Sequence, residues 1–344
     1  MSNIEVLIKA LPKVEQHIHI VGATRPDTLL WLVEEGGLKR PFKTVKDVRR
    51  YFRYNDFPHF INVYKTVFKC ITREDQFERI TYEMLEDDAR CNVRYVEASF
   101  SAPDHVRQGL DYPLLLDAIN RGVSQAQRDF NILCNLRIDL VRNYGPNMAM
   151  QVLDWIEEKR ENVVSVDIGG SEERFPPKPF GRVYQRAREM GLHLVAHAGE
   201  AAGPESIWDA INYLNVEHIG HGVTAKQSPK LVSHLLQQGI VLEMCPTSNV
   251  KTGAVASLSR HPIRELFEKG VTVTVNTDDP SMFNTSMDNE YLQLHRHLGF
   301  TVPELFQLTV SALDSSFMGE TQKTQMRESF VKDYQQLMDN GHEH

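Results

Sequence analysis

Short apolar runs alternate with longer amphipathic segments along most of the chain, and this rhythm is the clearest indication of its fold. Runs rich in valine, leucine and isoleucine are typical of buried strands, whereas apolar residues that recur every three or four positions are typical of helices. We expect strands over residues 14–20, 93–101, 132–141, 163–170, 193–200, 216–222, 240–249 and 271–279. About eight strands, each followed by helix, predict an α/β fold, the (β/α)8 TIM barrel.

A doubly wound open sheet is the competing interpretation of the same rhythm. Such sheets bind phosphate at a glycine-rich turn after the first strand, and no such fingerprint follows residues 14–20. We find no internal repeat, low-complexity segment or convincing linker. Residues 1–344 are therefore expected to form a single barrel domain, with residues 301–338 as closing helices.

Residues 42–90 depart from the rhythm, because they read as long helices rich in aromatic side chains. We interpret this segment as a helical insertion after the first strand, which is a common way to build a lid over a site. A helical layer packed on the body of the barrel explains the pattern equally well. The aromatic positions are Tyr51, Phe52, Tyr54, Phe57, Phe60, Tyr64 and Phe68.

Composition narrows the classes of ligand and location. The chain has 344 residues, of which 41% are hydrophobic and 24% are charged, as in globular proteins. A net charge of -8 without a Lys/Arg cluster predicts no nucleic-acid partner and favours a small molecule. No apolar run has the length of a membrane span or of a signal peptide, so we expect a cytoplasmic protein without a membrane partner. The spacing of Cys70, Cys91, Cys134 and Cys245 favours reduced, buried thiols.

Histidines and carboxylates collect where the predicted strands end. His17 and His19 lie on one face of the first strand, because side chains alternate along an extended chain. Another apolar run ends in His197-Ala198-Gly199-Glu200, where a turn at Gly199 would bring His197 and Glu200 to one cavity. This arrangement would place a metal ligand beside an acid.

His221, Asp278 and Asp279 end two later strands. The carboxyl ends of all barrel strands surround one site, so these groups are expected to converge with the first set. Taken singly, each has an ordinary explanation as a hydrogen-bonded core histidine or a solvated turn. It is much less expected that such residues would occur by chance at the ends of four strands together. Three histidines and a carboxylate are nitrogen and oxygen ligands suited to zinc, with room for a water.

These residues lie in motifs that together are highly specific. The chain resembles the adenosine deaminase family of the amidohydrolase superfamily over nearly its whole length. The matching motifs are LPKVEQHIHIVGATRPDTL, VDIGGSE, HAGE, HIGHG, CPTSN and NTDDP. The resemblance implies one Zn²⁺ per chain, held by His17, His19, His197 and Asp278, with the catalytic water as the remaining ligand.

The resemblance also implies the chemistry, which is hydrolytic deamination at purine C6 with release of ammonia. In this scheme His221 orients the water or accepts its proton, and Glu200 protonates purine N1. Gly170 offers its backbone N–H to N3, and Asp279 bonds N7. The fourth strand carries Asp167 and no lysine that could bridge two metals, which agrees with a single-metal member of the superfamily.

One position departs from the family pattern and leaves the substrate open. Adenosine-specific members usually carry an Asp that bonds the sugar, and members acting on free adenine tend to carry Glu, where this chain has Val21. By strand alternation Val21 should share the inward face of His17 and His19 and wall the pocket. We therefore expect the substrate to be a purine nucleoside, either adenosine or a 5′-modified adenine nucleoside. Candidate 5′-modified substrates are 5′-deoxyadenosine, 5′-methylthioadenosine and aminodeoxyfutalosine.

Two other functions stay open. One is deamination of adenine, an N6-substituted adenine or a nucleotide, although Arg25, Arg49, Arg50 and Arg53 are only scattered candidates for a phosphate pocket. The other is a non-catalytic zinc-barrel binding protein. Binding alone does not need an acid and a water-positioning histidine, so the presence of Glu200 and His221 favours an enzyme.

Overall fold

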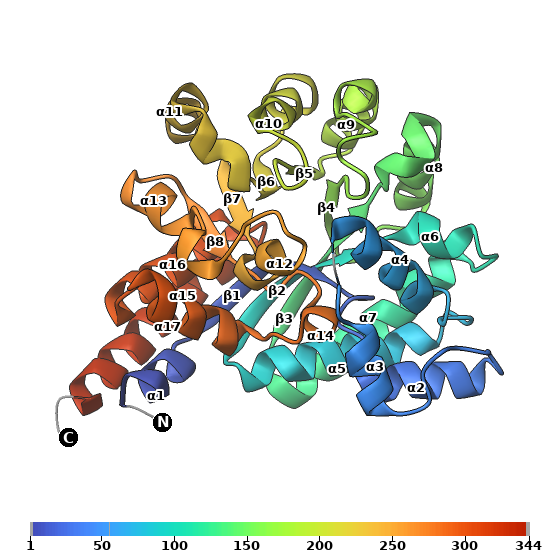
Figure 1. The fold of residues 1–344 in the computed structure, drawn as a ribbon, viewed down its shortest axis with the longest axis horizontal. Coiled ribbons are helices and arrows are strands. Elements are labelled where there is room, and N and C mark those ends of the chain that lie inside the picture. The colour runs from blue at the N-terminus through green and yellow to red at the C-terminus, as the bar shows by residue number, and fades with distance from the viewer. Residues whose placement is uncertain (1–2, 55, 342–344) are drawn as a thin grey trace.

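A computed structural model of the chain describes residues 3–54 and 56–341. Its centre is a parallel sheet in which eight strands pair in chain order. The strands are β1 (Lys13–His19), β2 (Val93–Phe100), β3 (Leu133–Asp139), β4 (Val163–Asp167), β5 (His193–Ala198), β6 (His218–His221), β7 (Val241–Met244) and β8 (Val273–Val275). A parallel bridge between Ile18 and Asp278 joins the two edges of the sheet. The predicted (β/α)8 barrel is thus confirmed (Figure 1).

Several strands are shorter than the apolar pattern predicts. The expected strand over residues 240–249 ends at Met244, because Pro246 begins a helix at its first turn. The expected strand over residues 271–279 keeps only Val273–Val275, and its remaining polar residues form the loop that carries the site. Asn276 explains how this loop is held, since its Oδ1 accepts hydrogen bonds from the backbone of Gln16 and His17 at 2.8 and 3.1 Å.

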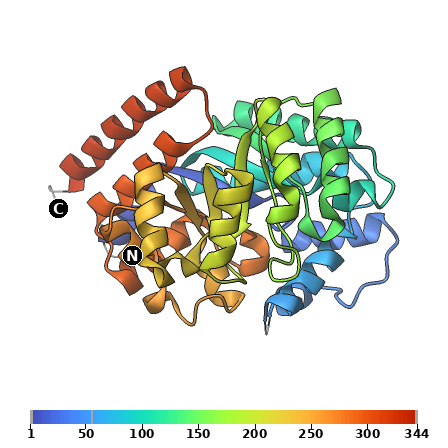
Figure 2. The same cartoon turned by 90° about the horizontal axis from the view of Figure 1, so that it is seen from above.

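Helices surround the strands, and many begin with proline in the first turn, where a missing N–H costs nothing. The two ends of the chain meet on one side of the barrel, where α1 packs against α15, α16 and α17 (Figures 1 and 2). The first eight helices are α1 (Asn3–Ala10), α2 (Pro26–Glu35), α3 (Val45–Tyr51), α4 (Phe57–Phe68), α5 (Gln76–Arg90), α6 (Ala102–Val106), α7 (Tyr112–Phe130) and α8 (Gly145–Glu158). The others are α9 (Gly181–Glu189), α10 (Pro204–Asp209), α11 (Pro229–Gln238), α12 (Pro246–Lys251), α13 (Ile263–Glu268), α14 (Pro280–Phe283), α15 (Met287–Leu298), α16 (Val302–Ser315) and α17 (Glu320–Gly341).

The aromatic-rich segment over residues 42–90 divides between the two expected roles. Helix α5 packs against α7 and β2 as part of the helical layer. Helix α4 instead covers a cavity at the carboxyl ends of the strands. It packs against α14 through the stacked rings of Phe60 and Phe283, whose centroids are 4.9 Å apart. The insertion therefore contributes both a layer and a cover.

The four cysteines are buried free thiols, as the sequence predicts. Within the described residues, no helix is both long enough and apolar enough to cross a membrane.

Candidate active site

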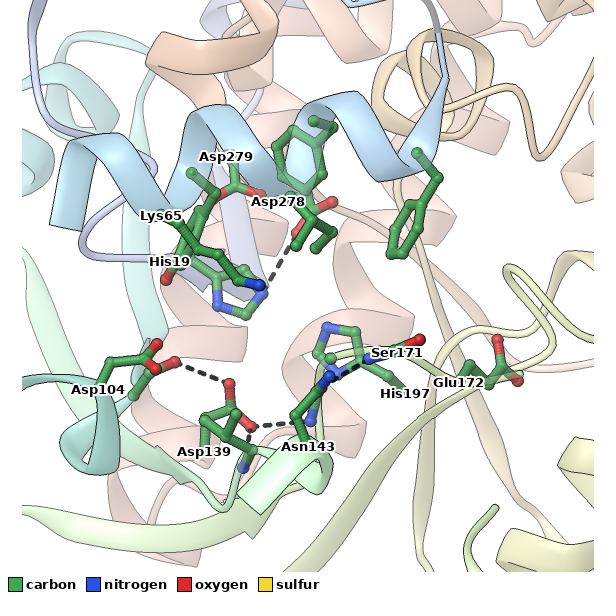
Figure 3. A pocket seen from close by; sticks show the side chains of 18 of the residues that line it. His19, Lys65, Asp104, Asp139, Asn143, Ser171, Glu172, His197, Asp278 and Asp279 are labelled. Carbon is green, nitrogen blue, oxygen red and sulfur yellow. Dashed lines mark hydrogen bonds and ion pairs between the residues drawn. The ribbon is translucent and has the colours of Figure 1, made fainter. Parts of the chain in front are cut away.

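The cavity beneath α4 gathers most of the residues that the sequence predicts for the site. Figure 3 shows His19 and Asp278 on one side of it and His197 on the other, with Asp104 and Asp139 farther along the wall. The predicted residues that line it are His19, Gly170, His197, Glu200, His221, Asp278 and Asp279. His17 is fully buried and does not line the cavity, but its ring centroid lies 4.5 Å from that of His197.

A potential metal site lies at the deep end of this cavity. One ligand atom from each of His17, His197, His221 and Asp278 lies within 4.8 Å of the others. The Nε2 atom of His17 is buried without a hydrogen-bond partner, as expected of a lone pair reserved for a metal. His19 is also adjacent, with its Nε2 3.3 Å from Asp278 Oδ1. Nitrogen and oxygen donors in this arrangement fit zinc.

The backbone at this site is locally unusual. His221 and Asp278 have φ values of 65° and 67°, in the left-handed region that side chains other than Gly and Asn rarely adopt. These bends turn both side chains toward the cluster after their strands end. Gly220 is required for the same cluster, because a Cβ atom there would lie 2.8 Å from His17 Cε1.

Buried carboxylates orient two of the histidines. His17 Nδ1 lies 3.0 Å from Glu243 Oε2, and His197 Nδ1 lies 3.1 Å from Asp167 Oδ1. A carboxylate can only accept, so each Nδ1 carries the hydrogen and each Nε2 is left with its lone pair. This is the tautomer that a metal-binding histidine needs.

Both carboxylates share one guanidinium. Arg137 Nη1 lies 2.6 Å from Glu243 Oε2 and 3.4 Å from Asp167 Oδ2, and all three side chains are fully buried. Burial alone would raise the pKa of Glu243, but the charge of Arg137 holds that pKa well below its usual range. Neither Arg137 nor Glu243 was predicted from the sequence. For Glu243, the available signal was a single charged residue in the otherwise apolar strand Val241–Met244.

A different network orients His221. The backbone N–H of Ile263 donates to His261 Nδ1 at 3.3 Å, so the hydrogen of that neutral ring lies on Nε2. His261 Nε2 lies 3.1 Å from Asn249 Oδ1, and Asn249 Nδ2 lies 3.1 Å from His221 Nδ1. His221 Nδ1 therefore accepts, and its Nε2 carries the hydrogen, in contrast to His17 and His197.

Glu200 lies against this ring, with Oε2 3.5 Å from His221 Nε2, while Thr252 donates to its Oε1 at 3.2 Å. Burial, followed by the charges of Asp278 and Glu172, raises the pKa of Glu200 to about 8. A carboxyl group with this pKa is mostly protonated at neutral pH and can act as an acid.

The turn that carries Glu200 is held by another carboxylate, Glu172, which was not predicted from the sequence. Glu172 Oε2 accepts from the backbone N–H groups of Glu200, Ala201 and Ala202 at 3.1, 2.8 and 3.1 Å. Its other oxygen accepts from Gly199. Four amides on one carboxylate fix the direction in which the turn points.

Val21 does not lie where strand alternation predicts. It is 2% exposed, packs in the hydrophobic core and is not among the residues that line the cavity. The reason is local, because β1 ends at His19 and the chain then turns, with Ala23 N donating to His19 O at 3.0 Å. Alternation holds only within a strand, so it does not extend to Val21.

A (β/α)8 barrel with a histidine and carboxylate cluster at the carboxyl ends of its strands defines the class of metal-dependent amidohydrolases. Within that class, the chain belongs to the adenosine deaminase family. The family model described as Adenosine deaminase matches residues 12–333. The protein is therefore an enzyme, a hydrolase acting on C–N bonds, as the motifs predict.

Two curated relatives match almost end to end. An aminodeoxyfutalosine deaminase from Streptomyces avermitilis is 35% identical over 331 residues, which cover 94% of this chain and 91% of the relative. An adenine deaminase from Acinetobacter baylyi is 30% identical over 321 residues, which cover 93% of this chain and 97% of the relative.

Solved structures share the fold, and one of them contains zinc. An amidohydrolase from Burkholderia ambifaria with bound zinc has a TM-score of 0.92 at 28% identity, with 100% of this chain and 96% of that chain covered. An Arabidopsis N6-mAMP deaminase has a TM-score of 0.84 at 28% identity, with 94% and 99% covered.

Proposed function

We propose that the protein removes the C6 amino group of a 5′-modified adenine nucleoside as ammonia, with one zinc ion per chain. The observation that carries this proposal is the layout of one cavity. Its deep end holds the histidine cluster with Glu200, and its outer end is a chamber lined by the aromatic side chains of α4. The base would occupy the deep end, so the sugar and a 5′ substituent would extend into the chamber. The similarity to an aminodeoxyfutalosine deaminase supports a substrate of this kind.

The zinc proposal follows from the hydrogen positions on the histidines. His17 and His197 present free Nε2 lone pairs, and Asp278 adds a carboxylate, so we assign these three as ligands together with His19. His221 carries its hydrogen on Nε2 and is assigned a different role. Zinc, when bound, lowers the pKa of a water toward neutrality and so provides the nucleophile for C6.

The chain supplies the remaining steps. Glu200, with its raised pKa, gives a proton to purine N1, so that the ring does not have to hold the negative charge created by attack at C6. His221 donates from Nε2 to the attacking oxygen and orients it. Since its Nδ1 is already engaged by Asn249, orientation is favoured over proton acceptance. The hydroxyl group added at C6 then gives its proton to the amino group, which leaves as ammonia as C6 becomes a carbonyl carbon.

Base recognition uses two further residues. Gly170 lines the cavity with φ of 104°, and a Cβ atom there would lie 2.2 Å from Asn143 Oδ1. Its backbone N–H is assigned to purine N3. Asp279 is 3% exposed and is assigned to N7. Both assignments require that the purine base binds with its C6 atom facing the histidine cluster.

The charged residues that line the cavity favour a nucleoside over a nucleotide as the substrate. Among the described residues that line the cavity, Lys65 is the one Lys or Arg, and it points inward from α4 (Figure 3). Asp104 and Asp139 also line the cavity. A phosphate dianion beside these carboxylates would be repelled, whereas a neutral 5′ group would not. A single negative charge at the far end of a 5′ substituent would suit Lys65.

Ammonia release from a substrate panel tests the proposal. The panel holds adenosine, 5′-deoxyadenosine, 5′-methylthioadenosine, a 5′-substituted adenine nucleoside that ends in a carboxylate, adenine, N6-methyladenine and AMP. We expect the highest kcat/KM for a 5′-modified nucleoside. A clear preference for adenine, N6-methyladenine or AMP would replace this substrate class with the corresponding one.

A matched pair of variants tests the chamber itself. Lys65→Gln should lower kcat/KM several-fold for the carboxylate-bearing nucleoside relative to 5′-deoxyadenosine, by loss of one charge-assisted contact. Lys69→Gln is the control, because Lys69 follows the same helix and does not line the cavity. Equal effects of the two variants would show that Lys65 does not contact the substrate.

A further inference from the structure

A second cavity, of about 880 Å³, lies beside α14 and is lined by none of the groups assigned to catalysis. Its walls come from the start of α2, the ends of α3 and α5, α14 and the start of α15. These segments are far apart in sequence but lie together on one side of the barrel (Figure 1). Three of the four scattered arginines that the sequence left without a role, Arg25, Arg49 and Arg53, line this cavity.

Positive charge in this cavity is only partly neutralised. Arg49, Arg53 and Lys251 line it, and none of the three has an ion-pair partner among the described residues. Lys251 donates to the carbonyl oxygen of Phe283 at the cavity wall. Three cations without an ion-pair partner among the described residues thus gather here, in a chain whose net charge is -8.

The other cations and the acids of the cavity largely cancel. Arg25 lies 2.7 Å from both Glu86 and Asp87, and Arg90 lies 2.8 Å from Glu86. Asp88 also lines the wall, and burial together with the neighbouring Glu15 raises its pKa well above the usual range. Asp27 and Asp88 are the acids that remain to oppose the three cations.

Neutral donors add to the positive character. Helix α2 begins at the cavity with Pro26, and no side chain caps its first turn. The unpaired amides of a helix N-terminus carry partial positive charge and favour anions. Asn284 and Asn289 contribute amide groups on the opposite wall.

We propose that this cavity binds a phosphorylated small molecule. Guanidinium groups match the geometry of phosphate oxygens, and the helix N-terminus adds amides of the same polarity. The volume exceeds that of a single phosphate, so the ester portion of a ligand has room. This site is separate from the deamination site and does not depend on which nucleoside is the substrate.

The position of the cavity couples it to the active site. Pro280 and Ser281 line it and directly follow Asp279 in the chain. Ser281 Oγ donates to Ala23 O at 2.8 Å, and Tyr54 OH donates to Met282 O at 3.1 Å. A phosphate held between Arg49 or Arg53 on the α3 side and Asn284 at the end of α14 would hold the insertion against the barrel.

Calorimetric titration of the zinc-loaded full chain tests the site. The probes are inorganic phosphate and pyrophosphate, with ionic strength matched by chloride and zinc content measured afterwards. We expect saturable binding with a dissociation constant below about 10 mM for at least one probe. Tighter binding of pyrophosphate would indicate an extended ligand, and equal binding would indicate a single phosphate subsite.

Variants distinguish binding in this cavity from nonspecific attraction of phosphate to surface charge. Arg49→Gln with Arg53→Gln should weaken binding about tenfold or more, because two charge-assisted contacts are lost. Arg50→Gln is the matched control, since Arg50 lies on the same helix, pairs with Asp47 and does not line the cavity. Equal loss in the control, or no saturable binding in the wild type, would overturn the proposal.

Hydrogen exchange provides a readout that is independent of activity. Phosphate should increase amide protection in residues 44–54 and 280–290 of the wild type, and not in the double variant. Binding without such protection would overturn the proposed link between α3 and α14.

Discussion

Asn249 donates a hydrogen bond to His221, with 3.1 Å between Asn249 Nδ2 and His221 Nδ1, and both side chains are buried. This hydrogen bond gives His221 a different tautomer from His17 and His197. His17 and His197 face carboxylates and keep Nε2 free, whereas His221 faces an amide donor and carries its hydrogen on Nε2. One cluster thus contains histidines prepared for two tasks.

Asn249→Asp should reverse the tautomer of His221, because a carboxylate accepts where the amide donates. We expect kcat to fall with little change in KM or zinc content. The ¹⁵N chemical shifts of the His221 ring report the tautomer directly. Asn284→Asp is a control at an exposed asparagine that does not line the active-site cavity. An unchanged ring spectrum in Asn249→Asp would show that Asn249 does not control the tautomer.

Zinc loss should distinguish the ligands from their neighbour. The purified protein should contain about one zinc per chain, and His19→Ala or Asp278→Ala should lose both metal and activity. His221→Ala should lose activity while it retains metal. Elemental analysis after gel filtration measures all three variants. Metal loss in His221→Ala with full retention in His19→Ala would exchange the roles of these two residues.

Glu243→Gln should weaken zinc binding by about 10- to 100-fold, since a carboxylate behind a metal histidine both orients the ring and raises its basicity. Competition with a chelator measures this affinity. Glu290→Gln is the matched control, because Glu290 is equally buried but accepts from Thr247 N, away from the metal histidines. Thermal unfolding should accompany both measurements, so that a general loss of stability is recognised.

Glu200→Gln should lower turnover by at least about 100-fold with zinc content unchanged, because the amide cannot protonate purine N1. The activity of the wild type, measured against pH, should also report the loss of this proton. With the pKa of Glu200 raised to about 8, the acid form is present below that pH and activity should fall as pH rises through it. Near wild-type turnover in the Gln variant would remove Glu200 from the mechanism.

Glu172→Gln should misdirect the turn that carries Glu200, since an amide accepts fewer backbone hydrogen bonds than a carboxylate and accepts them more weakly. We expect a lower kcat, a smaller change in KM and normal zinc content. Glu173→Gln, at an exposed neighbouring position, should leave all three unchanged. A loss of zinc in Glu172→Gln would mean that the turn supports the metal cluster instead.

The sequence by itself determined the barrel and the family. The hydrophobic period of a strand differs from that of a helix, so eight strand–helix units could be predicted from the sequence alone. The histidine motifs lie at the ends of the predicted strands, where the active sites of barrels form. It also identified Glu200 and Asp279 as cavity residues. Strand limits were less accurate, because apolar residues continue into buried loops and the helix begun by Pro246.

Only the tertiary structure decided which groups orient the site. Arg137 and Glu243 are 106 positions apart, and nothing local in either segment indicates that they meet. The placement of Val21 was decided the same way, because a turn after His19 ends the alternation on which its expected position depended. Arg49 and Lys251 likewise share one cavity only because the barrel brings α3 and α12 together. Local periodicity follows from backbone geometry, but these contacts follow from chain closure, which a pattern along the sequence does not encode.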